Sequence, residues 1–174
     1  MTEALPDNET REALKLKFDN ELRDDVHLTV FIGEQNPEYG DFTRRLVQEL
    51  NELDGRIQYT LHEDANGTAA EFGVTSTPTV LIGWEQGYRI KYTGAPAGHE
   101  ASGFIETLTL VSQGESGLQA ASLEKLDEVD QEASIQVFVT PTCPHCPRAV
   151  LLANSIAIAA KGRITAEAVE ASQN

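Results

Sequence analysis

The sequence predicts an α/β protein with a mixed central sheet, built as one complete unit followed by the first half of a second. Three observations support this prediction. Short β-branched runs alternate with amphipathic helical segments along most of the 174 residues. The triplet Val30-Phe31-Ile32 returns 107 positions later as Val137-Phe138-Val139, and each triplet leads through a loop into a helix and a strand. Both cysteines follow the second triplet closely.

The first unit can be divided into elements by its hydrophobic spacing. Apolar residues at helical intervals predict three helices and one shorter one, and Gly55 ends the most amphipathic of them. These helices are expected over 9–22, 42–55, 68–72 and 99–114. Apolar runs and alternating patterns predict strands over 27–33, 56–63, 77–84 and 88–94. The last two strands form an antiparallel hairpin.

The second unit starts after a joint with the sequence GESGLQAAS. A short helix containing Leu123, Leu126 and Val129 comes first, and the expected elements that follow are a strand over 134–141, a helix over 147–162 and a strand over 163–170. We therefore divide the chain into units over 1–114 and 115–174. The second unit lacks a counterpart of the hairpin and closing helix, which would leave a strand edge unpaired. We expect the sequence to be a truncated version of a chain of roughly 215–220 residues.

Charge and hydropathy exclude several classes of protein. The net charge is -15, from 28 acidic and 13 basic residues, so neither nucleic acid nor an anionic membrane is an expected partner. No apolar run approaches the ~18 residues of a membrane helix. The acidic N-terminus is not a secretory signal, so we expect a cytoplasmic protein. The acidic, Lys-poor composition suits a salt-rich cytoplasm as well as an ordinary acidic protein.

The two cysteines, Cys143 and Cys146, lie where a buried strand is expected to end and a helix to begin. Free N–H groups and the positive end of the helix would stabilise a thiolate at Cys143, which can then attack a substrate disulfide. Cys146, one turn later, can resolve the mixed disulfide. Pro144 suits the first turn, and His145 adds positive charge when protonated. The candidate supporting residues are therefore Thr142, Pro144 and His145.

Metal binding is the alternative interpretation of this pair. A structural zinc site needs four ligands, and none of the histidines is spaced as a second ligand pair. Those histidines are His27, His62, His99 and His145. Copper(I) held by the two thiolates alone is chemically possible. Because the motif and its strand-to-helix context agree, we expect redox exchange and no metal site.

Several segments together resemble a known family. They are LTVFIG, LVQELNEL, TPTVLI, YTGAPAGHE, VFVTPTCPHCP and KGRITAEAVEA, and they extend from about residue 10 to the end. The chain resembles the glutaredoxin-like protein disulfide oxidoreductases of archaea and thermophilic bacteria, which contain two fused thioredoxin folds. It is also similar to the N-terminal domain of the flavoprotein component of alkyl hydroperoxide reductase. The resemblance therefore implies tandem thioredoxin-like folds, arranged in three layers around the mixed sheet.

The resemblance also implies an activity and partners. It implies a cytosolic protein that exchanges disulfides with disulfide-bearing protein substrates, with no bound cofactor beyond the redox-active Cys143–Cys146 disulfide. A thioredoxin-reductase-type flavoenzyme using NADPH would reduce this disulfide again. One alternative is a dedicated relay from a flavin reductase to a peroxiredoxin. A second is a non-catalytic scaffold or metal-binding protein.

Carried over by motif, Cys143 matches the nucleophile and Cys146 the resolving cysteine. Thr77-Pro78 matches the Thr-Pro whose proline is usually cis and presents backbone to a substrate strand. The counterpart in the second unit would lie near position 184, roughly one repeat later.

The first unit departs from the family's pattern. Its stretch GEQNPEYGDF places Pro37 and Gly40 where many members have cysteines, and shifting the alignment by one gives Asn36 and Tyr39. We therefore expect this unit to be a scaffold or a substrate platform.

The CPHC motif also predicts the direction in which the reduction potential of the cysteine pair is shifted. A Pro-His pair between the cysteines resembles the periplasmic disulfide donor, whose potential is about -120 mV against about -270 mV for thioredoxin. We expect a couple more oxidising than thioredoxin.

Overall fold

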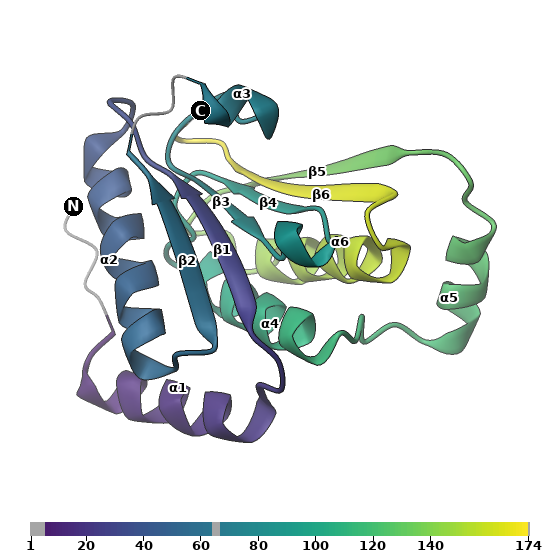
Figure 1. Cartoon of the computed structure of the whole chain (residues 1–174), viewed down its shortest axis with the longest axis horizontal. Coiled ribbons are helices and arrows are strands. Elements are labelled where there is room, and N and C mark those ends of the chain that lie inside the picture. The colour runs from purple at the N-terminus through teal and green to yellow at the C-terminus, as the bar shows by residue number, and fades with distance from the viewer. Residues whose placement is uncertain (1–5, 64–66, 174) are drawn as a thin grey trace.

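The computed structural model describes residues 6–63 and 67–173, which form a six-stranded mixed sheet with helices on both faces (Figure 1). The strand order is β2-β1-β3-β4-β6-β5. Pairing is parallel for β1–β2, β4–β6 and β5–β6 and antiparallel for β1–β3 and β3–β4. The strands are β1 (Val26–Phe31), β2 (Ile57–His62), β3 (Thr79–Ile82), β4 (Ile90–Thr93), β5 (Ala133–Val139) and β6 (Ile164–Glu170).

The helices match the predicted segments, but α5 ends before Val129, which was expected in that helix, and the start of α2 is also shifted. They are α1 (Asn8–Glu21), α2 (Pro37–Leu53), α3 (Thr68–Glu71), α4 (Glu100–Gln113), α5 (Ala120–Asp127) and α6 (Cys146–Ala160), with a 3-10 turn η1 (Trp84–Gln86). Helix α2 begins five residues before the expected start at 42, because Pro37 occupies its first turn, where a missing N–H costs nothing. The Asp7 side chain caps α1 by accepting a hydrogen bond of 2.8 Å from the Thr10 N–H.

The main core lies on one face of the sheet. There the inward-facing strand residues pack against α1, α2, α4 and α6, and Phe18, Leu28, Leu50 and Phe104 are fully buried among them. The other face has a much smaller cluster of Phe31, Ala69 and Leu81, covered by α3. The mixed α/β architecture predicted from the sequence is therefore confirmed.

The two halves of the chain share one continuous sheet. The parallel units β1-α2-β2 and β5-α6-β6 repeat the same connection, and β6 joins β4 of the first half in parallel. The boundary at 114/115 thus falls between strands of the same sheet, and the division into 1–114 and 115–174 stays a prediction.

Polar side chains on the open face tie the halves together. Glu167 of β6 accepts hydrogen bonds from Thr93 (2.5 Å) and Gln136 (2.8 Å) and lies 3.3 Å from the Lys91 ammonium. Burial alone would raise the pKa of Glu167, but these hydrogen bonds and the Lys91 charge hold it below its usual range.

Of the helices in the described ranges, none is both long and apolar enough to cross a bilayer.

Candidate redox site

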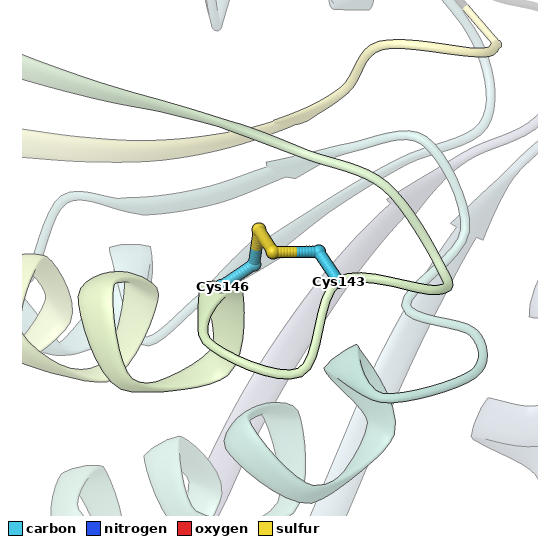
Figure 2. The surroundings of a disulfide bond; sticks show 2 residues. All are labelled: Cys143 and Cys146. Atoms are coloured by element: carbon cyan, nitrogen blue, oxygen red, sulfur yellow. A yellow bond between two sulfur atoms is a disulfide. The ribbon is translucent and has the colours of Figure 1, made fainter.

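Cys143 and Cys146 form a disulfide between the end of β5 and the start of α6 (Figure 2). Their Cα atoms are 5.5 Å apart. The Cys143 N–H donates to Thr140 O (3.1 Å), which closes a tight turn after the strand. Both cysteines are half-buried, and Cys146 also packs against the main core. The structure thus brings together the two cysteines that the sequence selects.

The start of α6 differs from the sequence-based expectation. The helix begins at Cys146, so Pro144 and His145 lie ahead of it rather than in its first turn. Pro147 occupies the first turn instead, where its missing N–H has no helical partner to lose. Thr142, Pro144 and His145 are all exposed. No side chain caps this helix end, so its first N–H groups face the loop that bears Cys143.

The loop before the disulfide is held by the start of α4, from the first half of the chain. The His99 N–H donates to Pro141 O at 3.2 Å. Gly98 has φ +61°, and a Cβ atom there would lie 2.7 Å from the same oxygen. Further along α4, Gly103 faces Pro147. A Cβ atom added at Gly103 would lie 3.4 Å from the Pro147 oxygen. The start of α4 therefore contacts the disulfide loop at both Pro141 and Pro147.

Glu100 lies between these two contacts, and its carboxyl group is buried. The residue is 2% exposed, and within the described part of the chain neither carboxylate oxygen has a hydrogen-bond partner. Burial raises its pKa to about 7. A buried carboxyl group with a raised pKa, on a helix that contacts the disulfide loop, is a candidate for acid–base chemistry.

Sequence reasoning did not identify Glu100. A glutamate in the first turn of a helix is ordinary, because it complements the positive helix end. What distinguishes Glu100 is its burial, which depends on tertiary contacts. A nearby buried polar group differs, because the side-chain nitrogen of Asn154 donates to Tyr92 Oη (3.2 Å) and Thr107 Oγ1 (2.9 Å).

The Thr77–Pro78 peptide bond is cis and precedes β3. The backbone of Thr77 is engaged within the first half of the chain: its N–H donates to Gln35 Oε1 and its carbonyl accepts from Asn36 Nδ2, each at 3.2 Å. Asn36 Nδ2 also donates to Gln173 O (2.9 Å). Of the hydrogen bonds found among described residues, none links Thr77 to either cysteine, so the structure does not bring these two predicted features into direct contact.

Histidines contribute no ligand cluster near the disulfide. His27 pairs with Thr60 at 2.9 Å, and His62 stacks on Phe31 with ring centroids 4.9 Å apart. Over residues 6–63 and 67–173, no three His, Cys, Asp or Glu side chains gather in a way that could hold a metal ion.

Comparisons with known proteins agree with this geometry. No family model matches the sequence. The structure resembles a protein disulfide oxidoreductase from Aeropyrum pernix, with a TM-score of 0.87 and 29% identity, covering 99% of this chain and 78% of that one. It also resembles the NTD_N/C domain of alkylhydroperoxide reductase AhpF from Enterococcus faecalis, with a TM-score of 0.80 and 24% identity, covering 97% of this chain and 81% of that one.

A curated relative supports the same relationship. The AhpF component of alkyl hydroperoxide reductase from Xanthomonas campestris pv. phaseoli is 26% identical over 113 residues, or 65% of this chain. The chain spans about a fifth (20%) of the length of that relative. The resemblance to protein disulfide oxidoreductases and to the AhpF N-terminal domain is therefore confirmed, and the chain has a thioredoxin-like fold with a disulfide at its CxxC motif.

Proposed function

We propose that this chain is a protein thiol–disulfide oxidoreductase in which Cys143 attacks and Cys146 resolves. The observation that carries the proposal is the Cys143–Cys146 disulfide at the strand-to-helix corner of a thioredoxin-like fold. A CxxC pair at a helix start is an arrangement that lowers the pKa of a thiol and so stabilises the thiolate.

The exchange is a two-electron reaction without a bound cofactor. In the reducing direction, the Cys143 thiolate attacks one sulfur of a substrate disulfide, and the other substrate sulfur leaves as a thiolate. The Cys146 thiolate then attacks Cys143 and releases the second substrate thiol. The substrate disulfide is reduced and the Cys143–Cys146 disulfide is formed. The same steps in reverse oxidise a substrate dithiol.

The protein supplies the charge stabilisation that these steps require. The uncapped N–H groups of α6 and the positive end of the helix favour a thiolate on the preceding loop, where Cys143 lies. Exposed His145 adds positive charge there when it is protonated. Both effects favour the dithiol over the disulfide and would make the couple more oxidising than thioredoxin.

Glu100 is proposed as the acid–base partner of Cys146. Cys146 must lose a proton before it can resolve the mixed disulfide, and it packs into the core on the side where α4 lies. A carboxyl group with a pKa of about 7 can accept that proton at neutral pH and return it in the reverse direction.

The partners follow from the same proposal. Disulfide-bearing proteins would be the substrates, and a thioredoxin-reductase-type flavoenzyme would return the protein to its dithiol form in the cytoplasm. A second candidate is a dedicated relay from a flavin reductase to a peroxiredoxin, which the similarity to AhpF favours. Rapid reduction of many unrelated disulfide proteins would contradict the relay and support the general oxidoreductase.

Insulin reduction with dithiothreitol tests the proposal. We expect the 174-residue chain to accelerate reduction of the insulin disulfides and Cys143→Ser to abolish the acceleration. Cys146→Ser should instead accumulate a mixed disulfide that is detectable by mass. Activity unchanged in Cys143→Ser would contradict the proposal. Inactivity combined with stoichiometric copper(I) or zinc binding by the thiols would favour the non-catalytic, metal-binding alternative.

A further inference from the structure

We propose that the first half of the chain contains a closed binding site for an extended peptide segment, and that the side chains of Gln35 and Asn36 keep this site closed. The site is the backbone of Thr77, immediately before Pro78 and β3. The proposal goes beyond the redox function, because it concerns the half of the chain that has no cysteine.

Two side-chain amides occupy both backbone hydrogen-bonding groups of Thr77. Its N–H donates to Gln35 Oε1 and its carbonyl accepts from Asn36 Nδ2, each at 3.2 Å. Gln35 and Asn36 are consecutive residues of the loop between β1 and α2, so both backbone groups of Thr77 point toward this loop. Thr77 is only 5% exposed, although Gln35 itself lies on the surface.

This arrangement reproduces the pairing of one residue with an antiparallel strand. In such a pair, two opposite residues exchange an N–H···O bond in each direction. Gln35 supplies the acceptor and Asn36 supplies the donor that a residue of an added strand would supply from its backbone. A peptide that binds in an extended conformation uses the same exchange. The two amides therefore stand in the place of a bound peptide.

The conformation of Asn36 supports a specific role for this contact. Asn36 precedes α2 as its N-cap, a position at which an asparagine side chain usually accepts a hydrogen bond from the first turn of the helix. Here its side chain makes no such cap, and its backbone is left-handed with φ +49°. Its Nδ2 group instead donates to Thr77 O and to Gln173 O (2.9 Å). The residue thus forgoes a stabilising cap while it covers the Thr77 carbonyl.

Space for a longer peptide lies beside the covered residue. A hollow of about 730 Å³ is lined by residues 33–35 and 74–77. Thr75 is exposed and, within the described part of the chain, forms no hydrogen bond, so its N–H and C=O are free to pair with a peptide. Glu34 and Glu63 also line the hollow, which disfavours an acidic segment. A neutral or basic extended segment would therefore fit once the two amides are displaced.

The closure confines peptide binding to the second half of the chain. This consequence rests on the proposed function, in which the thiols that act on a substrate lie in the second half. A peptide held at Thr77 would be bound without a thiol to act on it, since the loop beside it has no cysteine. Closing the site therefore removes an unproductive competitor for substrate.

Variants that remove or retain the amide contacts test the closure. The probe is fluorescein-labelled insulin B chain with carbamidomethylated cysteines, and its binding to the 174-residue protein is measured by fluorescence anisotropy. The double variant Gln35→Ala/Asn36→Gly uncovers both backbone groups, and glycine tolerates the left-handed backbone, so it should bind the probe at least about tenfold more tightly than the unmodified protein. Gln35→Glu retains an acceptor oxygen for the Thr77 N–H and should bind within about twofold of the unmodified protein. Equal binding by the double variant and the unmodified protein would overturn the proposal.

Gln35→Ala alone provides a second test if the double variant does not fold. Gln35 is exposed, and this change leaves the Asn36 contacts in place. In this variant the Thr77 amide should exchange with solvent faster than in the unmodified protein, as measured by NMR, and the probe should slow that exchange at least about fivefold. In the unmodified protein the probe should leave the exchange unchanged. Faster exchange that the probe does not slow would show that Gln35 only satisfies a buried group, and would overturn the proposal.

The result can be separated from that of the proposed function. The probe has no free thiol, so Cys143→Ser should bind it as the unmodified protein does. Insulin reduction that depends on Cys143, together with equal probe binding by the double variant and the unmodified protein, would overturn only the closed site. Tighter probe binding by the double variant, without Cys143-dependent reduction, would overturn only the function.

Discussion

The segments β1-α2-β2 and β5-α6-β6 have the same order and the same parallel pairing, yet their surroundings differ sharply. Phe31 and Phe138 occupy corresponding positions 107 residues apart. Phe31 is fully buried beneath α3, whereas 65% of Phe138 is exposed. In the first segment, Gln35 and Asn36 engage the backbone of Thr77. In the second, a disulfide follows the strand, and within the described residues no strand covers its outer edge.

This difference shows how one repeated pattern can serve two purposes. The first half supplies the start of α4, where the His99 N–H donates to Pro141 O of the loop before the disulfide, and α4 begins with the buried Glu100. The second half contributes the two thiols. This difference supports the proposal that the first half is a structural support for the redox chemistry proposed for the second.

Truncating the two phenylalanines should give the largest contrast in stability. Phe31→Ala removes a fully buried ring and should lower the free energy of unfolding by about 3–5 kcal/mol. Phe138→Ala should change it by less than about 0.5 kcal/mol, because the ring is mostly exposed. Urea unfolding of both variants measures the contrast, and equal losses would contradict the assigned environments.

The contact between the two halves at Gly98 should give the next largest effect. Gly98→Ala places a Cβ atom 2.7 Å from Pro141 O at φ +61° and should cost about 2–3 kcal/mol. Gly114→Ala is the matched control, because φ is +67° but the nearest atom is 3.7 Å away, and it should cost about 1 kcal/mol. Similar losses in the two variants would show that the Gly98–Pro141 approach is not tight.

Glu100→Gln should have a smaller effect that depends on pH. The folded-state pKa of about 7 lies above the usual 4.5, so the native protein retains a proton that the unfolded chain releases. Stability should therefore fall as pH rises from 4.5 to 7, by about 1–3 kcal/mol at most. Glu100→Gln should remove this decline in urea unfolding measured at about pH 5 and about pH 8. A decline of equal size in the variant would assign it to other groups.

Glu100 also connects stability to catalysis. If it accepts the Cys146 proton, Glu100→Gln should slow resolution of the mixed disulfide by about 100-fold and remove a pH inflection near 7. Stopped-flow measurement of the resolving step checks this. The initial attack by Cys143 on a small disulfide should remain within about twofold, because Glu100 is assigned to the second step.

Local patterns predicted much of the fold, and tertiary contacts account for what they missed. The strand over 163–170 was predicted from the alternation of Ile164, Ala166 and Ala168, and β6 confirms it. The start of α2 was missed because apolar spacing begins only at Phe42, while Pro37 starts the helix without an apolar signal. Pro144 was misplaced because Pro147, rather than Pro144, occupies the first turn of α6.

The candidate site was also predicted only in part, because some of its features depend on tertiary contacts. Cys143 and Cys146 are close in sequence, so their spacing could identify them. Glu100 comes from the other half of the chain, and its significance depends on burial in the folded protein, which no local pattern reports. The hydrogen bonds that engage Thr77 likewise depend on side chains far away in the sequence, with separations of 41 and 42 residues.

Alkylation of the reduced protein tests the central claim most directly. Limiting iodoacetamide at about pH 7, followed by peptide mass mapping, measures the rate at each thiol separately. The account predicts that Cys143 reacts at least about tenfold faster than Cys146, because the start of α6 stabilises its thiolate. Equal rates, or faster reaction at Cys146, would contradict the assignment of Cys143 as the nucleophile.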